Sequence, residues 1–466
     1  MFQQKFINRS DELKFLNNKY REKNNLIIIY GRRRVGKTEL IRQFIKDKKH
    51  IYFLADTRSG LDNLKQFQKI AGTHIQDNLF IKAHIEDWEE LFFELSKKTR
   101  EKLIIVIDEF PYLIEADKSI PSVFQKIWDL NLADKNIFLI LSGSSISMME
   151  NHLLNYRAPL YGRRTGQLLL KTLKFRHLKD FLPTYSKEDL VHVFGVCDGI
   201  PLYIQQFSDK YSFYDNLFYT VFNSGQFLYQ ELEFILKQEF KEPARYFSIL
   251  HSIANNKMKF GDIVIFTQMD KSVVSKYLDT LIMLHFVKKE YPVIQKKETR
   301  NANYIITDNY TKFWFRFIYP NKSAIEEKKQ DFLSKQIKKD FNAYLGYVFE
   351  DISKQLLWEK MPFDFVKIGR QWGKVPKSKE TYEIDLVALN DDKKEIGFFE
   401  CKWQDLTKNN ALNILEKLKQ KSKFVDWNLD NRKEHFGLIG KKIQDKEELK
   451  KQGFFAWDLD DFKFHG

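Results

Sequence analysis

Residues 31–38 read Gly-Arg-Arg-Arg-Val-Gly-Lys-Thr, and they directly follow the apolar run Leu26–Tyr30. A helical pattern, Glu39–Phe44, comes next. The spacing G-x4-G-K-T between a strand and a helix is typical of a loop whose backbone N–H groups surround phosphate oxygens. The positive end of the helix dipole adds to this attraction. We therefore expect the phosphates of a nucleotide to be bound by Gly31, Arg32, Arg33, Arg34, Val35, Gly36, Lys37, Thr38 and Glu39.

A second apolar run, Leu103–Ile107, ends in two acidic residues. Ligands of open α/β sheets bind at the carboxyl ends of the strands, so these acids should lie beside the phosphate loop. There Lys37 would neutralise the β- and γ-phosphates, while Thr38 and Asp108 would hold Mg²⁺. Glu109 would take a proton from the attacking water. Together the two segments favour an ATP-hydrolysing site. The alternatives are that the first segment is a glycine-rich turn without nucleotide and that the second is only a solvated acidic turn.

Bulk composition limits the class of protein. A chain of 466 residues holds about two to four domains. Its net charge of +14 fits a polyanionic partner such as DNA, although lysine-rich surfaces also serve solubility. No apolar stretch approaches the ~20 residues that span a bilayer, and no signal peptide is evident. Cys197 and Cys401 suggest no disulfide framework. We expect a cytoplasmic protein without a membrane segment.

The order of apolar and helical segments predicts an α/β fold in several domains. Alternating strands and helices near the start indicate a parallel sheet. The expected strands are Leu26–Tyr30, His50–Ala55, Leu103–Ile107, Ile137–Leu141 and Gly166–Leu170. We expect an ATPase core at 1–170, a helical lid at 171–235, a winged helix-turn-helix at 236–320 and a restriction-endonuclease-like α/β domain at 321–466.

The third of these segments carries the pattern of a winged helix-turn-helix. Its expected helices are Pro243–Asn255, Gly261–Met269 and Lys271–Leu284, and a two-strand segment, Phe286–Ile306, follows them. The third helix should expose Ser272, Ser275 and Lys276, and Arg300 should lie near the tip of the wing. Such a module binds duplex DNA or packs against protein.

Residues 321–339 are polar and predict a linker or an exposed helix. Beyond them, carboxylates gather on two predicted strands, Glu383–Leu389 and Ile396–Trp403. The two-residue period of a strand puts Glu400 and Lys402 on one face, which Asp385 can approach.

Carboxylate oxygens suit Mg²⁺ or Mn²⁺, and a bound metal would activate water for phosphodiester cleavage. Glu350, on a preceding helical stretch, could add a ligand. A cross-strand salt bridge on a solvated face is the alternative.

These motifs together resemble a known family, the AAA+/STAND-like P-loop ATPases that are common in archaea. The C-terminal part resembles the predicted PD-(D/E)xK nuclease domain that accompanies this ATPase. The matching segments are Phe6–Leu13, Gly31–Thr38, Ile107–Glu109, Leu139–Ser145, Pro159–Thr165, Gly199–Tyr203 and Phe313–Phe317.

The resemblance implies further roles in the ATPase part. Arg9 and its neighbours would line the adenine pocket, and Ser142 would sense the γ-phosphate. Arg163 or Arg164 could act as an arginine finger, in cis or from a second copy. The lid has no obvious sensor arginine beside Gly199–Pro201, which departs from the family pattern.

Two functions fit the sequence. The first is an ATPase that binds DNA and cuts it with a metal-dependent nuclease domain. The second is an ATP-dependent regulatory or signalling switch, whose C-terminal domain only binds nucleic acid or a protein partner. A homo-oligomer is compatible with both.

Overall fold

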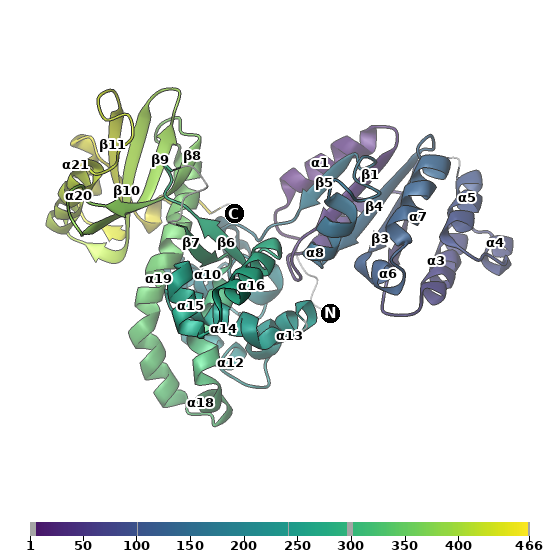
Figure 1. Ribbon diagram of the computed structural model, residues 1–466, viewed down its shortest axis with the longest axis horizontal. Helices are drawn as coiled ribbons and strands as arrows, with labels where there is room; N and C mark the ends of the chain where they lie inside the picture. Colours follow the sequence, from purple (N-terminus) through teal and green to yellow (C-terminus); the bar gives the residue numbers. More distant parts are fainter. Residues whose placement is uncertain (1–5, 100, 241, 296–301, 465–466) are drawn as a thin grey trace. The chain divides into compact units, whose positions relative to one another are not determined.

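The computed structural model describes residues 6–99, 101–240, 242–295 and 302–464. The chain folds into two compact units. The N-terminal unit takes the chain up to Thr172 together with Ile200–Leu202, and the C-terminal unit takes the rest. In Figure 1 the first is purple to blue, and the second runs from teal to yellow.

The N-terminal unit is built on a five-stranded parallel sheet, in the order β2-β3-β4-β1-β5. Every residue of β1, β3 and β4 is buried, because helices cover both faces. All five strands expected from the sequence are present. Their bounds are β1 Asn25–Tyr30, β2 His50–Leu54, β3 Leu103–Asp108, β4 Ile137–Gly143 and β5 Gly166–Leu169.

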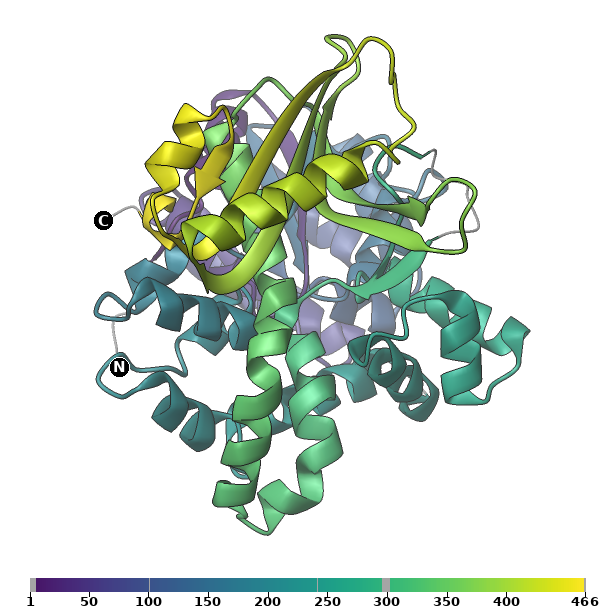
Figure 2. The same cartoon turned by 90° about the vertical axis from the view of Figure 1, so that its left-hand side faces the viewer.

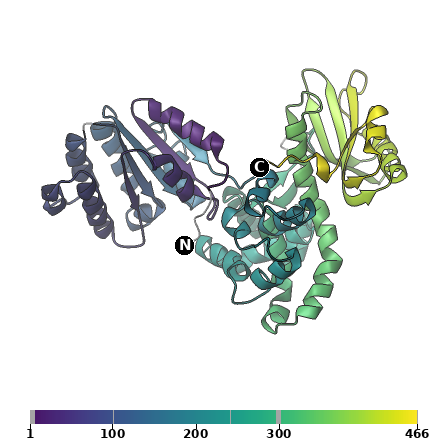
Figure 3. The same ribbon diagram turned by 180° about the vertical axis from the view of Figure 1, so that it is seen from behind.

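Two separate cores flank this sheet (Figures 1 and 3). On one face lie α1 and α2, and on the other lie mainly α3, α5, α6 and α7. The helices are α1 Ser10–Arg21, α2 Lys37–Ile45, α3 Gly60–His74, α4 Asn78–Lys82, α5 Trp88–Lys98, α6 Pro111–Ala116, α7 Ile120–Ile127 and α8 Ile146–Met149. Short π-helical turns continue α7 and α8 at Trp128–Leu132 and Glu150–Leu154.

The C-terminal unit begins with helices and continues into three helices and a strand pair. The first group is α9 Leu178–Phe181, α10 Lys187–Cys197, α12 Phe213–Thr220 and α13 Phe227–Glu239, while α11 Pro201–Ile204 crosses the boundary between the units. The helix-hairpin module then comprises α14 Pro243–Ala254, α15 Phe260–Thr267, α16 Lys271–Met283, β6 Val287–Glu290 and β7 Asn303–Ile306. Its strands are antiparallel. This is the element order of a winged helix-turn-helix, and that name stays a prediction. The residue expected at the wing tip, Arg300, lies outside the described residues.

A second five-stranded sheet, in the order β12-β11-β10-β9-β8, ends the chain. Its pairs β8–β9 and β9–β10 are antiparallel, and β10–β11 and β11–β12 are parallel. Figure 2 shows α20 lying across these strands. The elements are α17 Asn309–Phe313, α18 Lys322–Glu326, α19 Gln330–Lys360, β8 Lys367–Lys374, β9 Thr381–Asn390, β10 Glu395–Leu406, α20 Lys408–Ser422, β11 Lys433–Ile443, α21 Lys446–Lys451 and β12 Phe455–Trp457. Single helical turns at Phe175–His177, Trp314–Ile318, Tyr319–Asn321 and Leu459–Asp461 complete the unit.

The polar stretch after residue 321 is helical rather than a linker. The 31-residue helix α19 buries Leu333, Ile337, Phe341 and Tyr344, spaced three or four residues apart along one face. Figure 2 shows this helix running toward the sheet. The charged residues between these positions face solvent, which is why the segment looked uniformly polar.

Among the contacts that join the second sheet to the rest of its unit, two involve the segment after β6 and helix α10. After β6, the Val293 N–H donates to the Arg370 carbonyl on β8 at 2.9 Å, and the Val293 side chain is buried in the core of this sheet. On α10, His192 packs against Trp403 of β10, beside Glu188, Asp189 and Lys441. Burial lowers the pKa of His192.

Among the described residues, no helix combines the length and apolarity needed to cross a membrane.

Candidate functional site

The loop between β1 and α2 takes the backbone shape that its glycines permit. Gly31 has φ +150°, and a Cβ placed there would lie 2.5 Å from the Leu170 carbonyl oxygen. Gly36 has φ +94° with open space around it. Arg32, Arg33, Arg34 and Val35 lie between these glycines, and Glu39, one turn into α2, pairs with Arg42 at 3.2 Å. The predicted phosphate loop therefore has the strand–loop–helix context that its chemistry requires.

Lys37 is buried at the start of α2. Its Nζ donates to the Gly31 and Arg32 carbonyl oxygens, at 3.0 Å each. Burial lowers the pKa of Lys37 to about 8, against the opposing effect of Glu109 and Asp108. The ammonium is thus held inside the loop by weak neutral acceptors, and a phosphate would be a stronger partner.

Asp108, at the end of β3, is fully buried, and its carboxylate accepts hydrogen bonds from Thr38, Tyr52 and Glu109 among the described residues. Its Oδ2 accepts from Thr38 Oγ1 at 2.8 Å and from the Tyr52 hydroxyl at 2.7 Å. Its Oδ1 accepts from the Glu109 N–H at 3.1 Å. Thr38 and Asp108 therefore meet beside Lys37, where their oxygens suit Mg²⁺.

The proposed general base, Glu109, has a left-handed backbone, with φ 54°. Ser144 binds its carboxylate twice, through the backbone N–H at 3.1 Å and through a hydrogen bond from its hydroxyl. Nearby on β4, Ser142 is fully buried, and its hydroxyl makes no hydrogen bond to any described residue. An unpaired buried hydroxyl at a strand end fits the predicted γ-phosphate sensor.

The predicted arginines occupy different surroundings. Arg9 donates to the carbonyl oxygens of Val35 at 2.9 Å and Lys171 at 2.7 Å, and it pairs with Glu12 at 3.1 Å. It thus ties the start of α1 to the phosphate loop. Arg163 pairs with Asp129 at 3.0 Å, and Arg164 lies 4.4 Å from the Tyr161 ring centre. Adenine binding and the arginine finger stay predictions.

The second sheet brings three of the predicted nuclease residues together. Lys402 Nζ lies 3.0 Å from Asp385 Oδ2 and 2.6 Å from Glu400 Oε2. Glu400 is 3% exposed, and its other oxygen bonds Lys421 of α20 at 2.7 Å. Burial and Asp385 raise the pKa of Glu400. Two carboxylates therefore converge on one cationic atom.

The fourth predicted carboxylate, Glu350 of α19, forms an ion pair with Arg370 of β8. Burial raises its pKa, an effect that Arg370 opposes. Across the described parts of the chain, no three His, Cys, Asp or Glu side chains form a group that could hold a metal ion. Asp385 and Glu400 both pair with the Lys402 ammonium, whereas Glu350 pairs with the Arg370 guanidinium.

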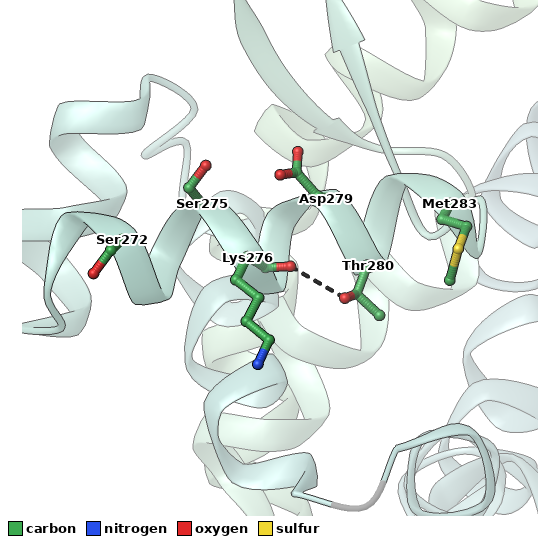
Figure 4. A pocket seen from close by; sticks show the side chains of 6 residues that line it. All are labelled: Ser272, Ser275, Lys276, Asp279, Thr280 and Met283. Atoms are coloured by element: carbon green, nitrogen blue, oxygen red, sulfur yellow. Dashed lines mark hydrogen bonds between the residues drawn. The ribbon is translucent and has the colours of Figure 1, made fainter.

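The helix-hairpin module offers a shallow hollow along α16 (Figure 4). Its volume is about 600 Å³. Its lining residues are Ser272, Ser275, Lys276, Asp279, Thr280 and Met283. The hydroxyls and Lys276 can contact phosphates, whereas Asp279 opposes an anion.

Comparison with known proteins identifies two parts of the chain. Residues 6–207 match an ATPase domain found predominantly in Archaea, and residues 314–414 match a family of archaeal and bacterial proteins of unknown function. The uncharacterized protein MJECL04 of Methanocaldococcus jannaschii is 41% identical over 98% of this chain and 100% of its own length. The chain belongs to the MJECL04 family. Its N-terminal unit is a P-loop ATPase domain.

Two further likenesses agree with this ATPase domain. The uncharacterized ATP-binding protein MJ0423 of the same organism is 62% identical over 9% of this chain and 76% of its own length. The solved structure of the Walker-type ATPase PABY2304 of Pyrococcus abyssi is 21% identical, covers 67% of this chain and 97% of its own, and superposes with a TM-score of 0.52. It shows that this chain shares the fold of that protein over the matched part.

The sequence did not point to three side chains that complete these sites. Tyr52 bonds Asp108 at the end of β3, Ser144 bonds the next residue, Glu109, and Lys421 bonds Glu400. The sequence did hold a clue to Tyr52, because its hydroxyl is a polar group on the short and otherwise largely apolar strand β2. Lys421 is one of many lysines on α20, and nothing in its spacing sets it apart.

Proposed function

We propose that the N-terminal unit hydrolyses ATP with Mg²⁺ held at Thr38 and Asp108. The meeting of these two side chains beside the buried Lys37 is the observation that carries the proposal. Bound there, Mg²⁺ would neutralise charge on the β- and γ-phosphates. Lys37 would leave its two carbonyl acceptors for the phosphates, because charge-assisted hydrogen bonds are stronger.

Hydrolysis then needs a base and a γ-phosphate contact. Glu109 would part from Ser144 and accept a proton from the water whose oxygen attacks the γ-phosphorus. The bond to the β–γ bridging oxygen would break, releasing ADP and phosphate. Ser142 would donate its unused hydroxyl to a γ-phosphate oxygen.

For the second sheet we propose divalent-metal-dependent DNA cleavage. The supporting observation is that Asp385 and Glu400 both bond the Lys402 ammonium, so their oxygens lie close to each other. Their hard oxygens fit Mg²⁺ or Mn²⁺, which would lower the pKa of a bound water. Lys402 would then turn to the phosphodiester, and Lys421 would keep Glu400 in place.

DNA would reach the protein through the helix-hairpin module. Ser272, Ser275 and Lys276 are exposed on α16, and Lys288 and Lys289 are exposed on β6. Contacts of this kind neutralise phosphates, so affinity should fall as salt rises. With Lys276→Ala/Lys289→Ala, the slope of log affinity against log salt should shrink by about 1.8 if each lysine neutralises one phosphate.

The test of nuclease activity is the cleavage of supercoiled plasmid and single-stranded DNA by the full chain. Mg²⁺ or Mn²⁺ is supplied with and without ATP. The variant is Glu400→Ala/Lys402→Ala. The matched control is Glu416→Ala/Lys419→Ala, which removes another carboxylate–lysine pair, 3.0 Å apart and exposed on α20.

Metal-dependent cutting that only the first variant loses would support the nuclease, and its ATP dependence would separate a gate from an independent activity. Absence of cutting with ATP turnover intact would refute the nuclease. The remaining function would then be an ATP-dependent switch that binds nucleic acid or a protein partner.

A further inference from the structure

Tyr52 sits where an edge strand meets the nucleotide site. It lies on β2, which pairs in parallel with β3, so that Leu54 is opposite Asp108. The neighbours Ile51 and Phe53 face the core under α3 and α5, whereas Tyr52 packs on the α1 and α2 side. Its ring lies 5.9 Å from the Arg42 guanidinium of α2. The tyrosine therefore reaches the phosphate-loop helix and the end of β3 together.

The hydrogen bonds of Asp108 show what this position does. Oδ2 has two side-chain donors, Thr38 and Tyr52. In the proposed ATPase site, Thr38 Oγ1 would bind Mg²⁺ through a lone pair, and its O–H can still donate to Asp108. Among the side-chain donors described for Asp108, the Tyr52 hydroxyl is the one that has no proposed bond to the metal, so it can hold the carboxylate independently of Mg²⁺. Because a phenol on a strand is held by backbone pairing and ring packing, it can fix the carboxylate at small entropic cost.

We propose that Tyr52 is a positioning residue that holds the Asp108 carboxylate in place for Mg²⁺–nucleotide. It touches neither the nucleotide nor the reacting water. Tyr52 should therefore raise nucleotide affinity only in the presence of Mg²⁺, because the orientation of the carboxylate matters only when it binds the metal. The proposal rests on the Mg²⁺ site proposed above at Thr38 and Asp108.

The experiment compares nucleotide affinity with and without metal. Calorimetry on the full chain gives the Kd of the non-hydrolysable analogue AMPPNP in EDTA and in saturating Mg²⁺. The ratio of the Kd in EDTA to the Kd in Mg²⁺ measures how much the metal increases affinity, and we call this ratio the Mg²⁺ gain. For Tyr52→Phe, we expect the Kd in EDTA to be unchanged and the Mg²⁺ gain to fall roughly tenfold, the size of one hydrogen bond to a charged group.

Two further variants make the outcome decisive. Tyr20→Phe also removes a phenol of this unit, one whose ring packs on Phe44 and Phe138. It should leave both constants unchanged. Asp108→Asn tests the Mg²⁺ site itself and should reduce the gain at least as much as Tyr52→Phe. Melting temperatures of all variants show whether each is folded.

Each result has one meaning. A reduced Mg²⁺ gain in Tyr52→Phe, with the gain of Tyr20→Phe intact, supports the positioning role. An unchanged gain in Tyr52→Phe beside a reduced gain in Asp108→Asn overturns the role of Tyr52 and leaves the Mg²⁺ site standing. An unchanged gain in both overturns the Mg²⁺ site and the role of Tyr52 with it. If Tyr52→Phe weakens nucleotide binding equally in EDTA and in Mg²⁺, Tyr52 supports the fold of the site and the positioning role is overturned.

Discussion

Replacing Ser142 by alanine should stabilise the nucleotide-free protein and slow ATP turnover. In the free protein the Ser142 hydroxyl is fully buried and bonds no described residue. Burying a hydroxyl without a partner costs about 1–3 kcal/mol. Its removal should therefore raise the free energy of unfolding by about 1 kcal/mol, which is about 2–4 °C in melting temperature for a domain of this size.

The effect on turnover has the opposite sign. A hydrogen bond to a charged phosphate contributes about 1.5–3 kcal/mol. If that bond forms fully only in the transition state, its loss lowers kcat by about 10- to 150-fold. The assays are thermal unfolding of nucleotide-free protein and steady-state phosphate release at saturating Mg²⁺–ATP.

Ser252 provides a matched control. It is fully buried in α14 of the other unit, and its hydroxyl also bonds nothing among the described residues. Ser252→Ala should raise the melting temperature and leave turnover unchanged. A lower melting temperature in Ser142→Ala would show that its hydroxyl has a partner in the free protein. Unchanged turnover would refute its contact with the γ-phosphate.

Three more changes have defined outcomes. Lys37→Ala should abolish phosphate release without lowering the melting temperature, because it removes a buried charge whose pKa is already depressed to about 8. Gly31→Ala should cost about 2 kcal/mol or more in unfolding by denaturant, since its Cβ would meet a carbonyl oxygen at 2.5 Å, whereas Gly60→Ala, with open space, should change little. His192 has a lowered pKa, so the unfolded chain binds its proton first. Stability should therefore fall as pH drops below about 6.5, by less in His192→Gln.

The N-terminal sheet was predictable because its strands are buried on both faces. Leu26–Tyr30 and Leu103–Ile107 are continuous apolar runs that no exposed helix would carry. The candidate site residues at the ends of these strands could be placed from strand direction alone. In the structure Thr38 donates to Asp108 beside the buried Lys37, and the roles of these three residues stay predictions.

Contacts that depend on side-chain direction could not be read in the same way. Tyr52 reaches Asp108 only because β2 lies beside β3, an order that the local sequence does not specify. Ser144 binds Glu109 because the Glu109 backbone adopts a left-handed shape, which no propensity favours for glutamate. Glu350 was predicted as a metal ligand from the helical segment that carries it. Its ion pair with Arg370 could not be predicted, because Arg370 lies on β8, a separate element.

Val293 lies between β6 and β7 in the chain, yet it is buried with Ile384 and Phe398 in the core of the last sheet. The packing of the module and the packing of the sheet therefore depend on each other at this position. A recombination event that exchanged only one of them would leave a hole at this position and an unpaired carbonyl at Arg370 on the edge strand. Substitutions at Gly369, whose Cβ would lie 3.4 Å from Val293, should be matched by smaller residues at position 293 in related chains.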